Sequence, residues 1–137
     1  MRVTIITPTF NSEKYLNDCI QSVADQDYPD IEHIVIDGKS TDGTVNIIKQ
    51  HSSSIARWIS EADRGMYDAI NKGMAMATGD IIGILNSDDM LASKDVVSTI
   101  VETFNKHQVD TIYGDLQYVD PDNIQKIYRT WKGKPYK

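Results

Sequence analysis

Short runs of apolar, β-branched residues alternate along this chain with segments in which apolar residues recur every three or four positions. The first pattern is typical of buried strands, and the second is typical of amphipathic helices. Strands that alternate with helices form right-handed βαβ units, so we predict an α/β protein with a mainly parallel sheet and helices on both faces. The predicted strands are residues 3–7, 31–36, 55–59, 81–85 and 109–113.

The segments between these strands supply the predicted helices. One begins near Ser12, the next is capped by Asp42, a third ends at Gly79 and a fourth begins at Ser93. Residues 119–123, VDPDN, are expected to form a turn between two strands. A length of 137 residues without repeats or linkers predicts a single domain.

Three polar clusters directly follow predicted strands, at residues 7–11, 37–44 and 86–89. Ligands of open parallel sheets bind outside the carboxyl ends of the strands, near the point where the strand order reverses. We therefore expect a binding site where the three clusters meet.

The formal net charge of −6 argues against general nucleic-acid binding and against a polybasic membrane anchor. A phosphate ligand would need a metal ion or a few local cations beside it. The lone Cys19 cannot form an internal disulfide, which favours a reducing compartment. The first residues form a predicted strand instead of a signal peptide, and no transmembrane segment is predicted, so the expected location is the cytoplasm.

The tripeptide GKS at residues 38–40 does not belong to a P-loop. That motif needs a glycine five residues before the GK pair, where this chain has His33. An EF-hand is also excluded, because Lys39 would take the third loop position and the glycine would come seventh. The three histidines lie in unrelated segments, without the spacing of a zinc site.

Asp88 and Asp89 follow an apolar strand, where two adjacent carboxylates repel each other unless a cation or solvent compensates. In one interpretation they bind Mg²⁺ or Mn²⁺, which take oxygen ligands and bridge to substrate phosphates. In the other they form a solvated turn in which one carboxylate caps the helix near Ser93.

Asp37, at the end of the second predicted strand, has two comparable interpretations. It either caps the following turn or accepts a hydrogen bond from a nucleobase N–H or a ribose hydroxyl.

Cationic residues flank the third predicted helix. Arg64 or Lys72 faces a diphosphate in one interpretation; in the other, Lys72 pairs with Asp68 on a solvated helix. Met66 and Met74 are predicted to be core residues. For the late aromatic residues, a sugar platform and ordinary sheet packing are the two interpretations, and packing is favoured. These residues are Tyr113, Tyr118, Tyr128 and Trp131.

Four stretches occur in a fixed order: VTIITPTFNSEKYLNDCIQSVADQDY, IEHIVIDGKSTDGT, SEADRGMYDAINKGMAMATGD and ILNSDD. Together they resemble the amino-terminal part of family 2 glycosyltransferases, which have the GT-A fold. The resemblance covers residues 2–91 continuously. Members of that family use nucleotide-sugars, usually with inversion at the anomeric carbon, and many build bacterial surface polysaccharides.

The resemblance implies a nucleotide-binding role for several residues. By analogy, Thr7, Pro8, Thr9 and Glu13 would line the nucleotide, and Asp37 would contact its base or ribose.

The resemblance also implies how the diphosphate is bound. Asp63 and Arg64 would lie near it, and Asp88 with Asp89 would stand for the family's D-x-D element. Asp89 is then the expected ligand of Mn²⁺ or Mg²⁺, and Asp88 a metal or ribose contact. Lys39 stands where the family more usually has glycine or asparagine.

The implied reaction transfers a sugar from a nucleoside-diphosphate sugar, most simply a UDP-sugar, to a saccharide or lipid-linked saccharide. A lipid-linked acceptor is compatible with peripheral association of the protein with a membrane. A metal would neutralise the departing diphosphate while a carboxylate deprotonates the acceptor. In the family that base comes from a later acidic motif, which is not recognisable here; Asp115, at the end of the fifth predicted strand, is the candidate, ahead of Asp120 and Asp122. We therefore expect donor binding in a chain that lacks the C-terminal acceptor and base portion.

Two other functions fit parts of the pattern. A sugar nucleotidyltransferase needs a glycine-rich, basic loop after its first strand, and TPTFNSEKY contains no glycine. A non-catalytic nucleotide-sugar-binding module, or a donor-binding fragment of a larger enzyme, would bind donor without turnover.

Overall fold

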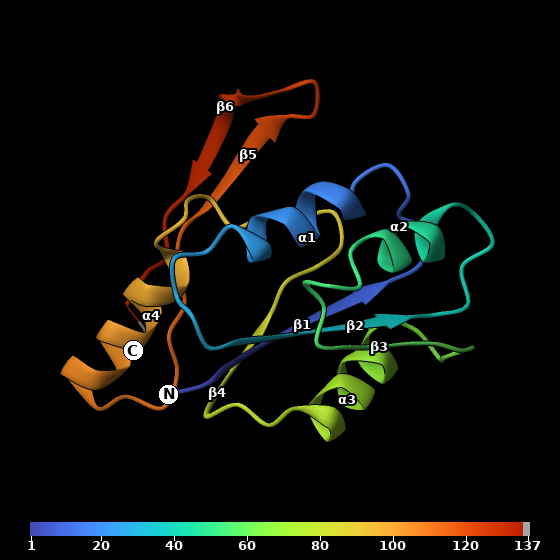
Figure 1. Cartoon of the computed structure of the whole chain (residues 1–137). Coiled ribbons are helices and arrows are strands. Elements are labelled where there is room, and N and C mark those ends of the chain that lie inside the picture. The colour runs from blue at the N-terminus through green and yellow to red at the C-terminus, as the bar shows by residue number, and fades with distance from the viewer. Residues whose placement is uncertain (136–137) are drawn as a thin grey trace. The chain divides into compact units, whose positions relative to one another are not determined.

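The computed structural model describes residues 1–135, and the chain divides into two compact units, Met1–Val101 and Glu102–Lys137. The sequence predicts one domain, whereas the structure has two units with one sheet each (Figure 1). Among the described residues no helix is long and apolar enough to cross a membrane.

The first unit contains a four-stranded parallel sheet in the order β3-β2-β1-β4. Its strands are β1 (Val3–Thr9), β2 (Ile31–Asp37), β3 (Arg57–Ser60) and β4 (Ile81–Ile84). β1 lies in the middle and is buried along its whole length. The predicted α/β class and mainly parallel sheet are confirmed, and the strand order reverses between β1 and β4.

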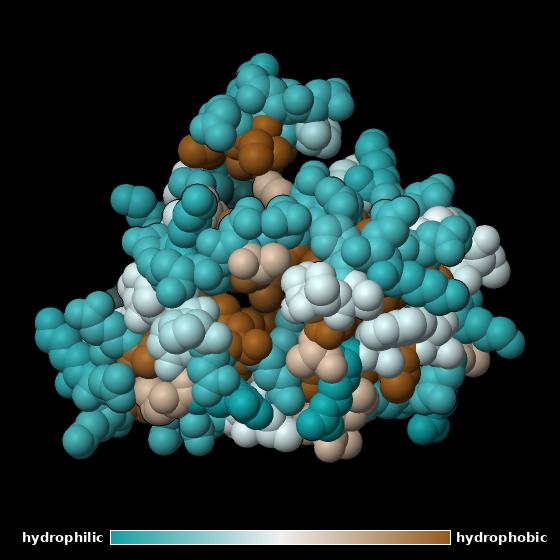
Figure 2. Space-filling view, viewed as in Figure 1, coloured by the Kyte–Doolittle hydropathy of each residue, from teal (hydrophilic) through white to brown (hydrophobic). Residues whose placement is uncertain are grey.

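Three helices cover this sheet: α1 (Leu16–Ala24) and α2 (Thr44–Gln50) on one face, and α3 (Met66–Met76) on the other (Figure 1). Alternate residues of β2 face opposite sides, as strand geometry requires. Val35 packs with α1 and α2, whereas Ile34 and Ile36 pack with Ala69 of α3. The face seen in Figure 2 is mostly hydrophilic, with apolar residues visible mainly in the gaps between hydrophilic ones.

The third helix is placed differently from the prediction. Its buried residues are Ala69, Ile70 and Gly73, whereas Met66 and Met74 are about half exposed, so the predicted core role of these methionines is wrong. A Cβ on Gly73 would lie 2.5 Å from Ile6 Cγ2, which shows that a small residue is what lets α3 approach β1.

Gly79 does not end this helix, which stops at Met76. Instead, its missing side chain makes room for β1, because a Cβ there would lie 2.7 Å from the backbone nitrogen of Thr4. The cap of α2 is also displaced by one residue. Gly43 occupies that position, and Asp42 Oδ1 accepts a 2.9 Å hydrogen bond from the Thr44 N–H.

The second unit has no strand at residues 109–113, so the fifth predicted strand is wrong. A β-branched run becomes a strand only when a partner strand pairs with its backbone, and none of the described residues does so here. The strands of this unit are β5 (Leu116–Asp120) and β6 (Asn123–Trp131), an antiparallel pair joined by the predicted turn. Asp115 therefore lies just before a strand, and its Oδ1 accepts a 2.9 Å hydrogen bond from Gly133 N.

The predicted packing of the late aromatic residues is not found. Each is more than half exposed: Tyr113, Tyr118, Tyr128 and Trp131. α4 (Val96–His107) spans the boundary between the two units and buries Val97 and Val101.

Candidate functional site

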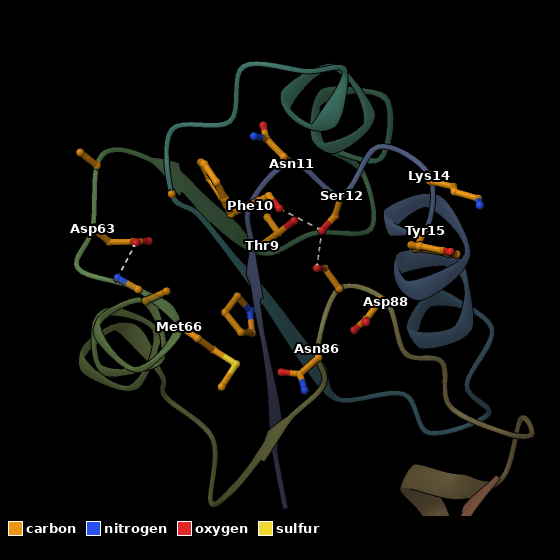
Figure 3. Close-up of a pocket in the computed structure, with 16 residues that line it drawn as sticks. Thr9, Phe10, Asn11, Ser12, Lys14, Tyr15, Asp63, Met66, Asn86 and Asp88 are labelled. Atoms are coloured by element: carbon orange, nitrogen blue, oxygen red, sulfur yellow. Dashed lines mark hydrogen bonds between the residues drawn. The ribbon is translucent and has the colours of Figure 1, made fainter. Parts of the chain in front are cut away.

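A cavity of about 890 Å³ lies at the carboxyl ends of β1, β2 and β4. Its lining comes from four parts of the chain: residues 8–12 with Lys14 and Tyr15, Gly38, five residues between Ala62 and Ala69, and residues 86–88 (Figure 3). The three predicted polar clusters therefore meet at one cavity, as expected from the topology.

Asp88 lines this cavity, and Asp89 follows it in the turn. Burial, and next the neighbouring charge of Asp88, raise the pKa of the Asp89 carboxyl above its usual value. The turn thus holds two adjacent carboxylates with no cationic side chain between them. A bound metal ion would relieve the repulsion between their negative charges.

The residues present fit a metal ion that takes part of its coordination from a ligand. No group of three or more His, Cys, Asp or Glu side chains in the described part of the chain is arranged to hold a metal alone. Asp88 and Asp89 offer carboxylate oxygens, the ligands that Mg²⁺ and Mn²⁺ prefer, and Mg²⁺ typically completes its shell with substrate phosphates and water.

Of the residues expected to line the nucleotide, Pro8 and Thr9 border the cavity. The Thr9 hydroxyl is buried and has no hydrogen-bond partner among the described residues, a costly state that a ligand would relieve. Thr7 and Glu13 lie outside the lining. Thr7 is fully buried, and Glu13 Oε2 accepts a 2.8 Å hydrogen bond from Gly43 N at the start of α2.

Asp37 is fully buried and is not among the lining residues of the cavity. Its Oδ2 accepts hydrogen bonds from Ser40 N at 3.0 Å and Ser60 Oγ at 2.6 Å, and its Oδ1 accepts one from Ser40 Oγ at 2.5 Å. The turn-forming interpretation of Asp37 thus has direct contacts, and its contact with a nucleoside stays a prediction.

Asp63 lines the cavity beside Gly38, and its Oδ1 accepts a 3.0 Å hydrogen bond from Gly65 N. A Cβ on Gly38 would lie 2.9 Å from Asp63 Oδ2. A side chain at this position would therefore have to displace the Asp63 carboxylate.

Neither of the two cations near α3 is among the lining residues of the cavity. Lys72 Nζ lies 3.1 Å from Glu61 Oε1 and 3.7 Å from Asp68 Oδ2, so the predicted i,i+4 pair is confirmed. Arg64 lies outside the lining, and its backbone N–H donates to Asp68. Among the lining residues the one Lys or Arg side chain is Lys14, on the same side of the cavity as Tyr15 (Figure 3).

Sequence reasoning missed two apolar residues at the cavity. Phe10 is 61% exposed and Met66 is 47% exposed, and both line it (Figure 3). Phe10 lies inside the first polar cluster, so an aromatic residue in a predicted binding loop was the available signal. Met66 matched a helical repeat, which hid it among the expected core residues.

Comparison with known proteins places this geometry among glycosyltransferases. The model of the family described as glycosyl transferase family 2 matches residues 4–137. Over 114 residues the chain is 41% identical to Rv1514c, an uncharacterized glycosyltransferase of Mycobacterium tuberculosis, covering 82% of this chain and 44% of the relative.

Two solved structures have the same fold. TarS of S. aureus, solved in complex with UDP-GlcNAc, superposes with a TM-score of 0.73 at 28% identity, covering 80% of this chain and 33% of TarS. The mannosyltransferase PcManGT of Pyrobaculum calidifontis was solved with GDP-Man and Mn²⁺. It also superposes with a TM-score of 0.73, at 27% identity, covering 90% of this chain and 37% of PcManGT. The chain thus spans less than half the length of the relatives that it matches.

Proposed function

We propose, because the chain belongs to glycosyl transferase family 2, that its cavity binds a nucleoside-diphosphate sugar and that the protein transfers the sugar to an acceptor hydroxyl. The observation that carries this proposal is the meeting of two elements at one cavity. The end of β1 with the loop that follows it and the turn that contains Asp88 both line it, although they lie far apart in the sequence.

The nucleoside end of the donor is proposed to lie against Pro8, Thr9 and Phe10. The buried Thr9 hydroxyl lacks a partner, and the exposed Phe10 ring offers an apolar surface to a base. Asp37 is proposed to contact the base or ribose from the turn after β2, and Glu13 is proposed to support this side of the site through its hydrogen bond from Gly43 N. UDP is the favoured nucleotide. TarS was solved with UDP-GlcNAc and PcManGT with GDP-Man, so both a uracil and a guanine nucleotide are to be tested.

The diphosphate end is proposed to lie near Asp63, Arg64 and the Asp88–Asp89 turn. Asp89 and Asp88 would hold Mn²⁺ or Mg²⁺, and the presence of Mn²⁺ in the PcManGT complex supports a divalent cation. Such an ion supplies positive charge for the diphosphate that departs. The chain's own contribution is to keep the two carboxylates adjacent and to hold the residue before the turn against β1, where Leu85 N donates a 2.9 Å hydrogen bond to Ile6 O.

The acceptor is proposed to be a saccharide or lipid-linked saccharide in surface polysaccharide synthesis. The transfer is proposed to invert the configuration at the anomeric carbon and to take place in the cytoplasm. Inversion in one displacement needs a base opposite the leaving group. Asp115 is the proposed base. If an Asp115→Asn variant keeps both donor affinity and full transfer activity, Asp115 is not the general base.

A donor-binding portion of a longer transferase is the second candidate function. It is favoured by the length comparison, since the chain spans 44% of Rv1514c. In that case the 137-residue chain binds donor and supports only slow donor hydrolysis, because a general base typically contributes about 10²–10⁴ in rate.

Calorimetry with UDP, GDP and dTDP, each with Mn²⁺ and with chelator, tests the proposal. We expect one nucleotide to bind clearly better than the others and to need the metal. Asp89→Asn should weaken binding in Mn²⁺, whereas the matched control Asp25→Asn, at the exposed end of α1, should not. Absence of binding by all three nucleotides, or equal affinity with and without metal, would refute it.

A further inference from the structure

The Asn86–Asp89 turn is attached to the rest of the first unit by a set of small polar side chains. Cys19 Sγ on α1 donates to the backbone oxygen of Asn86 at 3.4 Å. Next to it, Ser22 Oγ accepts a 3.1 Å hydrogen bond from Leu91 N. The turn itself is closed by a 3.0 Å bond from Asp89 N to the same Asn86 oxygen.

Cys19 is the last member of a buried polar chain that begins in the sheet. Thr7 Oγ1 on β1 lies 2.9 Å from His33 Nε2 on β2 and 4.0 Å from Cys19 Sγ. All three side chains are buried, with at most 2% of their surface exposed. The chain of contacts therefore runs from β2 through β1 and α1 to the turn that carries Asp88.

The direction of these hydrogen bonds follows from the atom that lacks a partner. His33 Nδ1 is buried without a hydrogen bond, and an unpaired acceptor is found more often in proteins than an unpaired N–H donor. The proton is therefore assigned to Nε2, which donates to Thr7 Oγ1. The Thr7 hydroxyl then donates to Cys19 Sγ, and the Cys19 thiol donates to Asn86 O, so each donor is used once.

We infer that Thr7 and Cys19, oriented by His33, are positioning residues that set the Asn86–Asp89 turn and thereby the place of its carboxylates. This inference rests on the proposed function for its consequence, which is tighter binding of the diphosphate. It also gives Thr7 a different role from the nucleotide contact expected by resemblance, since Thr7 acts from behind the cavity.

The turn responds to this contact because one backbone oxygen serves two donors. Asn86 O accepts from Cys19 and from Asp89 N, so loss of the thiol leaves the oxygen free to move with the turn. The amide of Leu91, in contrast, is held by Ser22 and should not depend on the thiol.

The first test follows amide hydrogen exchange in the ligand-free 137-residue protein. Cys19→Ala should increase exchange of the Asp89 amide several-fold while the Leu91 amide stays unchanged, and Cys19→Ser should restore slow exchange because a hydroxyl also donates to Asn86 O. Val23→Ala, which removes buried apolar contacts from the same helix, is the matched control and should leave both amides unchanged. Unchanged exchange at Asp89 in Cys19→Ala would overturn the inference.

The second test compares UDP in Mn²⁺ with uridine by calorimetry. Cys19→Ala and Thr7→Val should weaken UDP by about fivefold to tenfold, as expected for the loss of one hydrogen bond, and uridine by less than about twofold. Cys19→Ser should keep the UDP affinity. A general packing defect would instead weaken both ligands together, and this result overturns the inference. If the unmodified protein binds neither ligand, the proposed function fails, and the exchange experiment still decides the positioning role.

Discussion

Ser12 Oγ lies 2.7 Å from Ser87 Oγ, joining residues that are 75 positions apart in the sequence. Ser12 belongs to the loop after β1, and Ser87 belongs to the turn after β4. The Ser12 backbone N–H also donates to Thr44 Oγ1 at 2.8 Å, at the start of α2. The proposed nucleoside-binding loop and the proposed metal-binding turn are therefore connected directly.

Ser87→Ala should weaken UDP binding in Mn²⁺ more than uridine binding. The variant removes one hydrogen bond, typically worth about 0.5–1.5 kcal/mol, from the turn that carries Asp88. Ser98→Ala is the control, because this serine of α4 donates to the backbone oxygen of Asp95 and is not among the lining residues of the cavity. Calorimetry measures both affinities, and equal losses for the two ligands would contradict a role of the Ser12–Ser87 contact in placing the turn.

Asp37→Asn should weaken UDP binding more than binding of inorganic pyrophosphate. The carboxylate orders the turn after β2 through Ser40 and Ser60, and a hydrogen bond to a charged group is typically worth about 1.5–3 kcal/mol. Part of that loss should also appear as a lower free energy of unfolding. Isothermal titration of both ligands, on protein shown to be folded by circular dichroism, measures the difference. If the two affinities fall equally, Asp37 does not act on the nucleoside.

Lys39→Gly should stabilise the protein. Lys39 has a backbone φ of 64°, in the left-handed region that costs a non-glycine residue about 1–2 kcal/mol, and its side chain is exposed. Since glycine also loses more chain entropy on folding, we expect a net gain of about 1 kcal/mol in urea denaturation. Lys49→Gly, on the exposed side of α2, should instead destabilise by about 1 kcal/mol. A loss of stability in Lys39→Gly would mean that its side chain makes a compensating contact.

Acidification should destabilise the protein through His33. Burial lowers the pKa of His33 from 6.5 to about 4, so between these values the unfolded chain binds a proton that the folded chain does not. Stability therefore falls as pH drops from about 6.5 toward 4, by about 2 kcal/mol for this group at pH 5 relative to pH 7.5. Urea denaturation at both pH values measures the change, and His33→Gln should show a pH dependence smaller by that amount. An identical pH dependence in the variant would exclude His33 as the titrating group.

The sequence by itself determined the parallel sheet and the edge at which the cavity forms. Runs such as residues 34–36 place apolar residues on both faces of a strand, which a sheet covered on both sides accommodates, and the structure buries Ile34 and Val35 on opposite faces. The polar clusters that follow these runs had to lie at the carboxyl ends of the strands. The positions of Pro8, Thr9 and Asp88 on one cavity follow from this local order.

Only the tertiary structure decided which polar residues face the cavity and which support it. Thr7 and Thr9 are two positions apart in the same strand, yet Thr7 is used by His33 and Cys19 while the Thr9 hydroxyl has no partner. Lys72 forms ion pairs with Glu61 and Asp68 and is not among the lining residues. Such choices depend on partners that are distant in the sequence, and residue type and spacing do not identify them. The same reason explains residues 109–113, whose composition favours a strand but whose backbone has no partner strand among the described residues.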